Sequence, residues 1–207
     1  LDWGLSLTAP FVARNQEENK AVLSLLKPGT DLNEAWLIFG LSLVASAVPA
    51  AAGDTMHDSV MAVLSVAVVG GALRILAAFF KNVFGSALIM KGMSLYSALA
   101  LFVIGLSCGS MVTGGDLMSG VGIVISLWLI LACFQLAALY GAVKIVNPLG
   151  ERCRAAFLVS SILQLLLFLG MAFLLKGAIA DGPLSVFFWL GLAVSSVLSI
   201  SAFVLAR

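Results

Sequence analysis

Charged side chains are scarce in this sequence. Of its 207 residues, 11 are Lys or Arg and 10 are Asp or Glu, so 10% of the chain is charged while 62% is hydrophobic. Soluble proteins carry about 25% charged and about 45–50% apolar residues. So few charges cannot cover a water-facing surface, and the composition therefore predicts a polytopic membrane protein. The net charge of +1, without a long basic run, gives no indication of a nucleic-acid partner.

Residues that hold metals and cofactors are also few. The three cysteines, Cys108, Cys133 and Cys153, are far apart and lack the paired spacing of zinc or iron–sulfur sites. Their odd number argues against a disulfide framework. His57 is the single histidine, so the chain alone cannot hold a haem between two imidazoles. The sequence therefore predicts no metal site and no cofactor bound by this chain alone.

Long apolar runs, in contrast, are abundant. A helix needs about 17–25 apolar residues to cross a hydrocarbon core about 30 Å thick. The runs that meet this length are 35–52, 59–80, 93–113, 117–143, 155–175 and 183–206. They show no two-residue alternation, and backbone groups in lipid must be satisfied within the segment, so they are predicted to be helices. A shorter stretch, 1–13, is interpreted as the second half of a further helix. The predicted fold is an all-α integral membrane protein with six full transmembrane helices and a partial first helix.

Basic residues are concentrated in alternate loops. The first, third and fifth loops contain Arg14, Lys20, Lys27, Lys81, Lys91, Lys144, Arg152 and Arg154. The second and fourth loops contain none, and the sixth contains only Lys176. By the positive-inside rule, the first, third and fifth loops are predicted to be cytoplasmic. Arg74, the only charge within a full helix, lies near the cytoplasmic end, where it either snorkels to the interface or pairs with a polar partner in the membrane.

Two of these loops resemble each other. Residues 14–23 and 147–156 are both short charged segments that return the chain to an apolar helix. An offset of four helices preserves orientation, so the similarity suggests a parallel repeat of four-helix units. On this interpretation, 1–207 is a single transmembrane domain in which 1–115 is the first unit and 116–207 is an incomplete second unit.

The strongest group of candidate functional residues opens the second predicted helix. Asp31, Glu34 and Trp36 lie at its cytoplasmic start, where carboxylates are favoured by the helix dipole and tryptophan suits the interface. They either cap the helix or form a polar mouth that takes protons from the cytoplasm. Asp2 is a further candidate, because a carboxylate within the membrane needs a partner or a polar cavity.

Other polar and small residues within the helices favour packing roles. Gln135 and Gln164 are predicted to form hydrogen bonds between helices, while Gly105-x-x-x-Gly109 and Gly70-Gly71 permit close helix contact. The sequence contains no nucleophile–base pair and no phosphate-binding loop. Composition and spacing alone therefore indicate a multi-pass membrane subunit without an assigned chemistry.

A series of short motifs adds to this interpretation. The first part of the chain contains, in order, Leu1-Asp2-Trp3-Gly4, Pro10-Phe11, Arg14-Asn15 with Glu18, and Asp31-x-Asn33-Glu34-Ala35-Trp36-Leu37. Segments 79–85 and 138–154 extend the pattern. These motifs resemble subunit II of the cytochrome bd ubiquinol oxidases. Two positions depart from the usual family pattern: Glu34 replaces a glutamine and Tyr140 replaces a histidine.

The resemblance implies a function in respiration. Oxidases of this family reduce oxygen to water with electrons from quinol, and haems b and d are expected in the partner subunit I. Subunit II is expected to pack against subunit I in a bacterial or archaeal inner membrane and to contribute to proton uptake. On this route Asp31 matches the family's acidic residue, with Trp36 beside it and Glu34 and Asp2 as further members. The chain alone is expected to lack a complete active site.

Two other functions are alternatives to that of an oxidase subunit. One is a secondary transporter or permease component built of repeated helical units. This class usually places charges at the membrane midplane, whereas Arg74 is off-centre. The other is a structural membrane partner without chemistry of its own.

Overall fold

The described part of the chain is entirely helical in its regular structure. A computed structural model describes residues 2–25, 38–40, 43, 58, 61–70, 72, 86–113, 118–145 and 148–179. Its main elements are α1 (Asp2–Val12), α2 (Gln16–Leu25), α5 (Ser86–Thr113), α6 (Gly120–Lys144) and α7 (Pro148–Ile179). Residues 61–70 form a further helical segment. These elements confirm the predicted all-α class.

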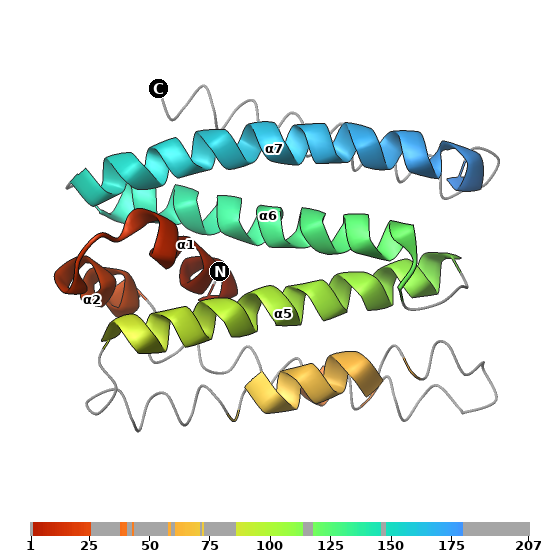
Figure 1. The fold of residues 1–207 in the computed structure, drawn as a ribbon, viewed down its shortest axis with the longest axis horizontal. Helices are drawn as coiled ribbons and strands as arrows, with labels where there is room; N and C mark the ends of the chain where they lie inside the picture. Colours follow the sequence, from red (N-terminus) through yellow and green to blue (C-terminus); the bar gives the residue numbers. More distant parts are fainter. Residues whose placement is uncertain are drawn as a thin grey trace.

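Three long helices form the body of the molecule. Helices α5, α6 and α7 lie side by side and alternate in direction, with α6 between the other two (Figure 1). Helix α1 packs against all three, and α2 lies beside the start of α5. The starts of α5 and α7, the end of α6, and α2 therefore meet at one end of the bundle, called the charged end below.

All three long helices are able to cross a membrane by length and composition. The candidate spans are Leu88–Ser110, Gly120–Lys144 and Pro148–Gly170. They correspond to the predicted runs 93–113, 117–143 and 155–175. Half of the predicted set of six is thus confirmed as long apolar helices.

The boundaries of these helices differ from the predicted ones. Helix α5 begins at Ser86 rather than 93, and α7 begins at Pro148 rather than 155 and ends at Ile179 rather than 175. Helix α6 begins at Gly120 rather than 117, because Ser119 caps it by accepting a 3.1 Å hydrogen bond from the backbone N–H of Gly122. Hydropathy marks the part of a helix that lies in lipid. The hydrogen-bonded helix continues into its polar flanks, where proline is well tolerated in the first turn.

The remaining predicted spans are only partly described. Within 59–80, residues 61–70 are helical, in agreement with the prediction. Apart from residues 38–40 and 43, the run 35–52 lies outside the described residues, as does all of 183–206. The count of six helices and the division into units 1–115 and 116–207 therefore remain predictions.

Helix α2 was not predicted, since the sequence indicated a loop between the first two apolar helices. The backbone N–H of Glu18 donates to Asn15 Oδ1 at 2.8 Å, which caps the first turn. The loop prediction is wrong here because this helix is stabilised by its cap and by one apolar contact rather than by a long apolar run. Val22 supplies that contact, packing into a buried cluster with Val12, Met90 and their neighbours.

Of the glycines predicted to allow close helix contact, Gly70, Gly105 and Gly109 do so, and Gly71 lies outside the described residues. A Cβ atom on Gly105 would lie 2.3 Å from Ser126 Cα, and one on Gly109 would lie 2.2 Å from Gly122 Cα. Both distances are shorter than real Cβ atoms tolerate, so α5 and α6 approach each other as closely as their backbones permit. Gly70 lies similarly against the ring of Tyr96, which joins the 61–70 segment to α5.

One of the two predicted glutamine contacts is confirmed. Gln135 on α6 is buried and donates a 2.8 Å hydrogen bond to Ser161 Oγ on α7. The buried Oε1 atom of Gln164 has no hydrogen-bond partner among the described residues. Polar contacts of this kind fix the rotational setting of packed membrane helices.

Candidate functional site at the charged end

Most of the predicted site residues fall outside the described part of the chain. This applies to Asp31, Glu34, Trp36 and Arg74, which the structure therefore neither brings together nor separates. Asp2 lies in the first turn of α1, and its backbone is described while its side chain is not. The described residues that precede Asp31 in the sequence form α1 and α2.

Helix α1 is held inside the bundle by close backbone packing. Gly4 faces α6 so closely that a Cβ atom would lie 2.1 Å from the carbonyl oxygen of Cys133. Thr8 Oγ1 donates to Gly4 O at 2.8 Å and lies 3.4 Å from Phe134 O. One buried hydroxyl therefore contacts backbone carbonyls of both α1 and α6. The Trp3 ring packs edge-on against Tyr96 of α5 at 6.4 Å between ring centres. Asp2 thus lies at the start of a helix that is held in place by contacts with both α5 and α6.

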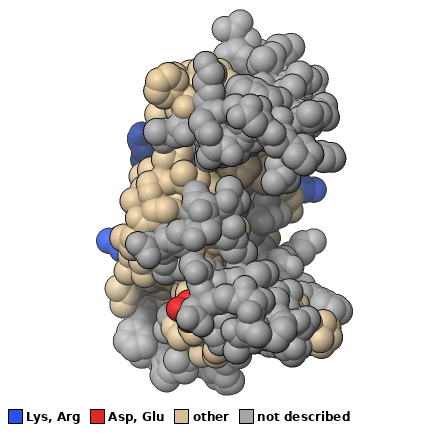
Figure 2. Space-filling model, turned by 90° about the vertical axis from the view of Figure 1, so that its right-hand side faces the viewer, with Lys and Arg blue, Asp and Glu red and all other residues tan. Residues whose placement is uncertain are grey.

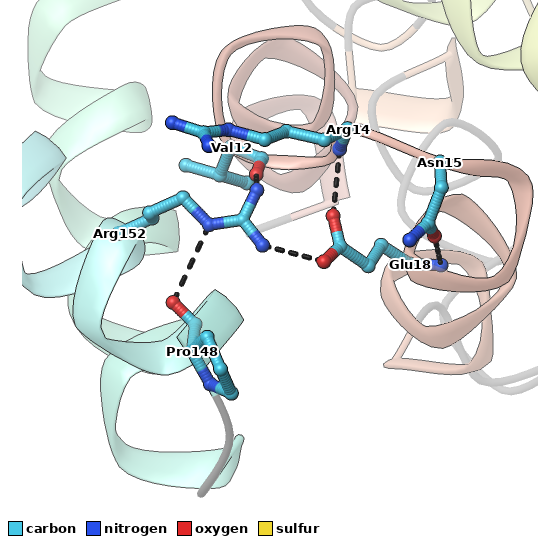
Figure 3. A network of polar contacts seen from close by, with 6 residues as sticks. All are labelled: Val12, Arg14, Asn15, Glu18, Pro148 and Arg152. Carbon is cyan, nitrogen blue, oxygen red and sulfur yellow. Dashed lines mark hydrogen bonds and ion pairs between the residues drawn. The ribbon is translucent and has the colours of Figure 1, made fainter.

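A polar network joins the end of α1 to the start of α7 (Figure 3). Arg152 on α7 forms an ion pair with Glu18 on α2, with 2.5 Å between Nη2 and Oε1. The same guanidinium donates through Nη1 to the carbonyl oxygen of Val12 at 2.5 Å, and through Nε to Pro148 O at 3.4 Å. The last carbonyls of a helix lack partners within it, so Arg152 satisfies one of them at the end of α1.

Glu18 is the acceptor at the centre of this network. Its Oε2 atom accepts a 2.6 Å hydrogen bond from the backbone N–H of Arg14, which closes the turn between α1 and α2. The side-chain hydrogen bond from Arg152, reinforced by that of the Arg14 backbone, lowers the pKa of the Glu18 carboxyl below its ordinary value of 4.5. Glu18 is therefore a fixed anion at neutral pH and acts as a structural tie.

The network unites the two charged segments that are similar in sequence. Glu18 belongs to residues 14–23 and Arg152 to residues 147–156, and the two lie 134 residues apart in the chain. Sequence reasoning did not identify this pair. Asn15 followed three residues later by Glu18 is a helix-start signature that predicts the cap, whereas a contact over such a separation has no local signal.

Other described basic residues gather at the same end of the bundle. They are Arg14, Lys20, Lys91, Lys144 and Arg154. Seen from the opposite end, the described surface is mostly uncharged, with a few charged side chains at its margins (Figure 2). No group of three or more potential metal ligands lies within the described residues, and the three cysteines are free thiols.

The fold and this network define the class of protein as a multi-pass helical membrane protein whose N-terminal helices are tied to a later helix by charge. The sequence model described as cytochrome bd terminal oxidase subunit II matches residues 1–207. The chain belongs to this family, as the resemblance indicated, and is thus a subunit of the bd-type terminal oxidase class. No curated protein matches the chain.

Proposed function

We propose that this chain is the non-haem subunit II of a bd-type quinol:oxygen oxidoreductase, which packs against a haem-bearing subunit I and contributes to proton uptake from the cytoplasm. The observation that supports this is the family match over residues 1–207. Haems b and d belong to subunit I in this proposal, and quinol is the electron donor. The single histidine, His57, fits a subunit that leaves haem ligation to its partner.

The proposed proton route begins at the charged end. Asp31 is its entry group, Trp36 lies beside it in the sequence, and Glu34 and Asp2 are further carboxylates on the way. Helix α2 ends at Leu25, a few residues before Asp31 in the sequence, and the Glu18–Arg152 pair anchors this helix to α7. Carboxylates that exchange protons with water are suited to such a relay. Arg74 is assigned in this proposal as a polar partner within the membrane.

The orientation of the bundle in the membrane follows from the same charges. Basic residues gather where α5 and α7 begin and α6 ends, while the opposite end has few charges on its described surface (Figure 2). Cytoplasmic loops of membrane proteins are enriched in lysine and arginine. The charged end is therefore assigned to the cytoplasm, the side from which a quinol oxidase of this type takes protons for water formation.

Replacement of Asp31 by asparagine tests the relay. The amide keeps the size and capping ability of the side chain but cannot take up and release a proton, so quinol-driven oxygen consumption should fall by about one to two orders of magnitude. Haem absorbance of the purified oxidase should be unchanged. Glu17→Gln is the matched control, because Glu17 is an exposed carboxylate on α2, and its turnover should equal that of the unmodified enzyme. Full activity of Asp31→Asn would exclude the relay role.

Co-purification tests the assignment to an oxidase complex. An affinity tag on this chain should recover a second, haem-bearing subunit in stoichiometric amount, with the absorbance of b- and d-type haems. The measurement is a spectrum and a subunit ratio on the same sample. A functional, haem-free chain purified alone would contradict the proposal.

A further inference from the structure

An apolar groove opens beside the charged end. It has a volume of about 920 Å³ and is formed by side chains of α1, α5, α6 and α7. Phe11 and Phe134 form part of its wall, packed edge-on with 5.6 Å between ring centres. Leu95 and Leu163 also line it and are largely exposed, so the groove opens along the outer face of the bundle.

Basic side chains surround one end of this groove. Arg14, Lys91 and Arg152 are the charged residues among its described lining, and each comes from a different part of the chain. Glu18 offsets the charge of Arg152. Within the described residues, neither Arg14 nor Lys91 forms an ion pair with a carboxylate. Among the described residues, the mouth of the groove therefore carries excess positive charge, whereas its walls are apolar.

The length of the groove corresponds to one leaflet of a bilayer. Its lining extends along α7 from Arg152 to Leu163, which is about 16 Å for a helix. Half of a hydrocarbon core of about 30 Å is about 15 Å. On α5, Ser94 follows Lys91 by one turn on the same face and also lines the groove. A polar head at the cations would thus place its chains along the apolar wall as far as the middle of the membrane.

We propose that this groove binds an anionic phospholipid of the leaflet next to the charged end, with its phosphate between Arg14 and Lys91 and its acyl chains along the apolar wall. Basic pockets between membrane helices on the cytoplasmic side recognise anionic head groups in this way. Charge complementarity selects this occupant. A quinone is uncharged and would leave the cations without a partner, and an apolar helix of another subunit would do the same.

Native mass spectrometry of the purified complex that contains this chain tests the proposal. The delipidated complex is titrated with phosphatidylglycerol or with phosphatidylcholine, and the occupancy of bound lipid is recorded. The unmodified complex should bind phosphatidylglycerol more tightly. The double variant Arg14→Gln, Lys91→Gln should weaken phosphatidylglycerol binding by about thirtyfold and leave phosphatidylcholine binding unchanged. Because the readout is lipid occupancy, it does not depend on turnover or on the proton route.

Two further variants separate charge from shape. Ala155 lines the groove and is exposed, so Ala155→Phe should block it and reduce binding of both lipids. Lys144 is an exposed basic residue at the same end that is not among the described lining, so Lys144→Gln should bind as the unmodified complex does. Glycerol phosphate, which lacks acyl chains, should not displace the lipid. Equal binding of both lipids by all variants, a quinone in place of the phospholipid, or a helix of another subunit seated in the groove would each overturn the proposal.

Discussion

Replacing Gly4 by valine should separate α1 from the rest of the bundle and prevent assembly of the complex. A Cβ atom at this position would lie 2.1 Å from Cys133 O, 2.8 Å from Cys133 C and 2.9 Å from Ala137 Cβ. Two of these three are backbone atoms of α6, which cannot move aside as a flexible side chain can. The expected loss of stability is about 3 kcal/mol or more, at the upper end of overpacking effects. The measurement is the yield and thermal unfolding of the complex in detergent.

Gly92→Ala is the matched control for this substitution. Gly92 lies on α5, and a Cβ atom there would meet nothing within 4 Å. The added methyl group should leave assembly and the unfolding temperature unchanged or slightly raised, because alanine favours a helix more than glycine does. Normal assembly of Gly4→Val, or equal damage by both variants, would show that the contact between α1 and α6 is not what positions the first helix.

Reversing the charges of Glu18 and Arg152 should have the second largest effect. Either single reversal, Glu18→Arg or Arg152→Glu, places like charges face to face, and Arg152→Glu also removes the donor to Val12 O. Each should lower the unfolding temperature of the complex by several degrees and reduce its yield. The double reversal restores opposite charges and should recover a large part of the loss. Lys144→Glu, at an exposed position of the same end, should have little effect.

The stability that this ion pair contributes should decrease as the pH falls. The pKa of the Glu18 carboxyl is lower in the folded protein than its ordinary value of 4.5, first through the hydrogen bond from Arg152. Its contribution to stability is therefore complete above pH 4.5 and is lost as the pH falls from there through the lowered pKa. The difference in unfolding temperature between the unmodified complex and Glu18→Gln should be constant near neutral pH and shrink on acidification. A difference that grows in acid would contradict the ion pair.

The sequence was sufficient to predict the long apolar helices of the described part of the chain. Helices α5, α6 and α7 coincide with long apolar runs, because only a helix satisfies its backbone within the hydrocarbon core. Their ends were misplaced, since α7 begins at Pro148 and carries Arg152 in its early turns, where hydropathy is low but hydrogen bonding continues. Helix α2 was missed because it is short and mostly polar. Its signal was local, in the spacing of Asn15 and Glu18.

The candidate site was harder to predict because its contacts join distant segments. Gly4 and Glu18 were noted only as members of family motifs, and the structure supplies a physical reason for each. Gly4 allows α1 to touch the backbone of α6, and Glu18 binds a residue of α7. No periodicity or spacing within a single segment specifies either contact. The proposed entry group Asp31 rests on its motif, and its test is the asparagine variant described above.

The tie between Glu18 and Arg152 also forms late relative to the synthesis of α1 and α2. The ribosome adds Arg152 134 residues after Glu18, which at about 5–20 residues per second is a delay on the order of ten seconds. During that interval α5 and α6, against which α1 packs, are already made, and of its described partners only α7 is missing. Helix α1 can therefore pack against α5 and α6 before the ion pair forms, and Arg152 then joins α7 to the turn that follows α1. In the biogenesis of this subunit, the ion pair thus follows the packing of its first helix rather than directing it.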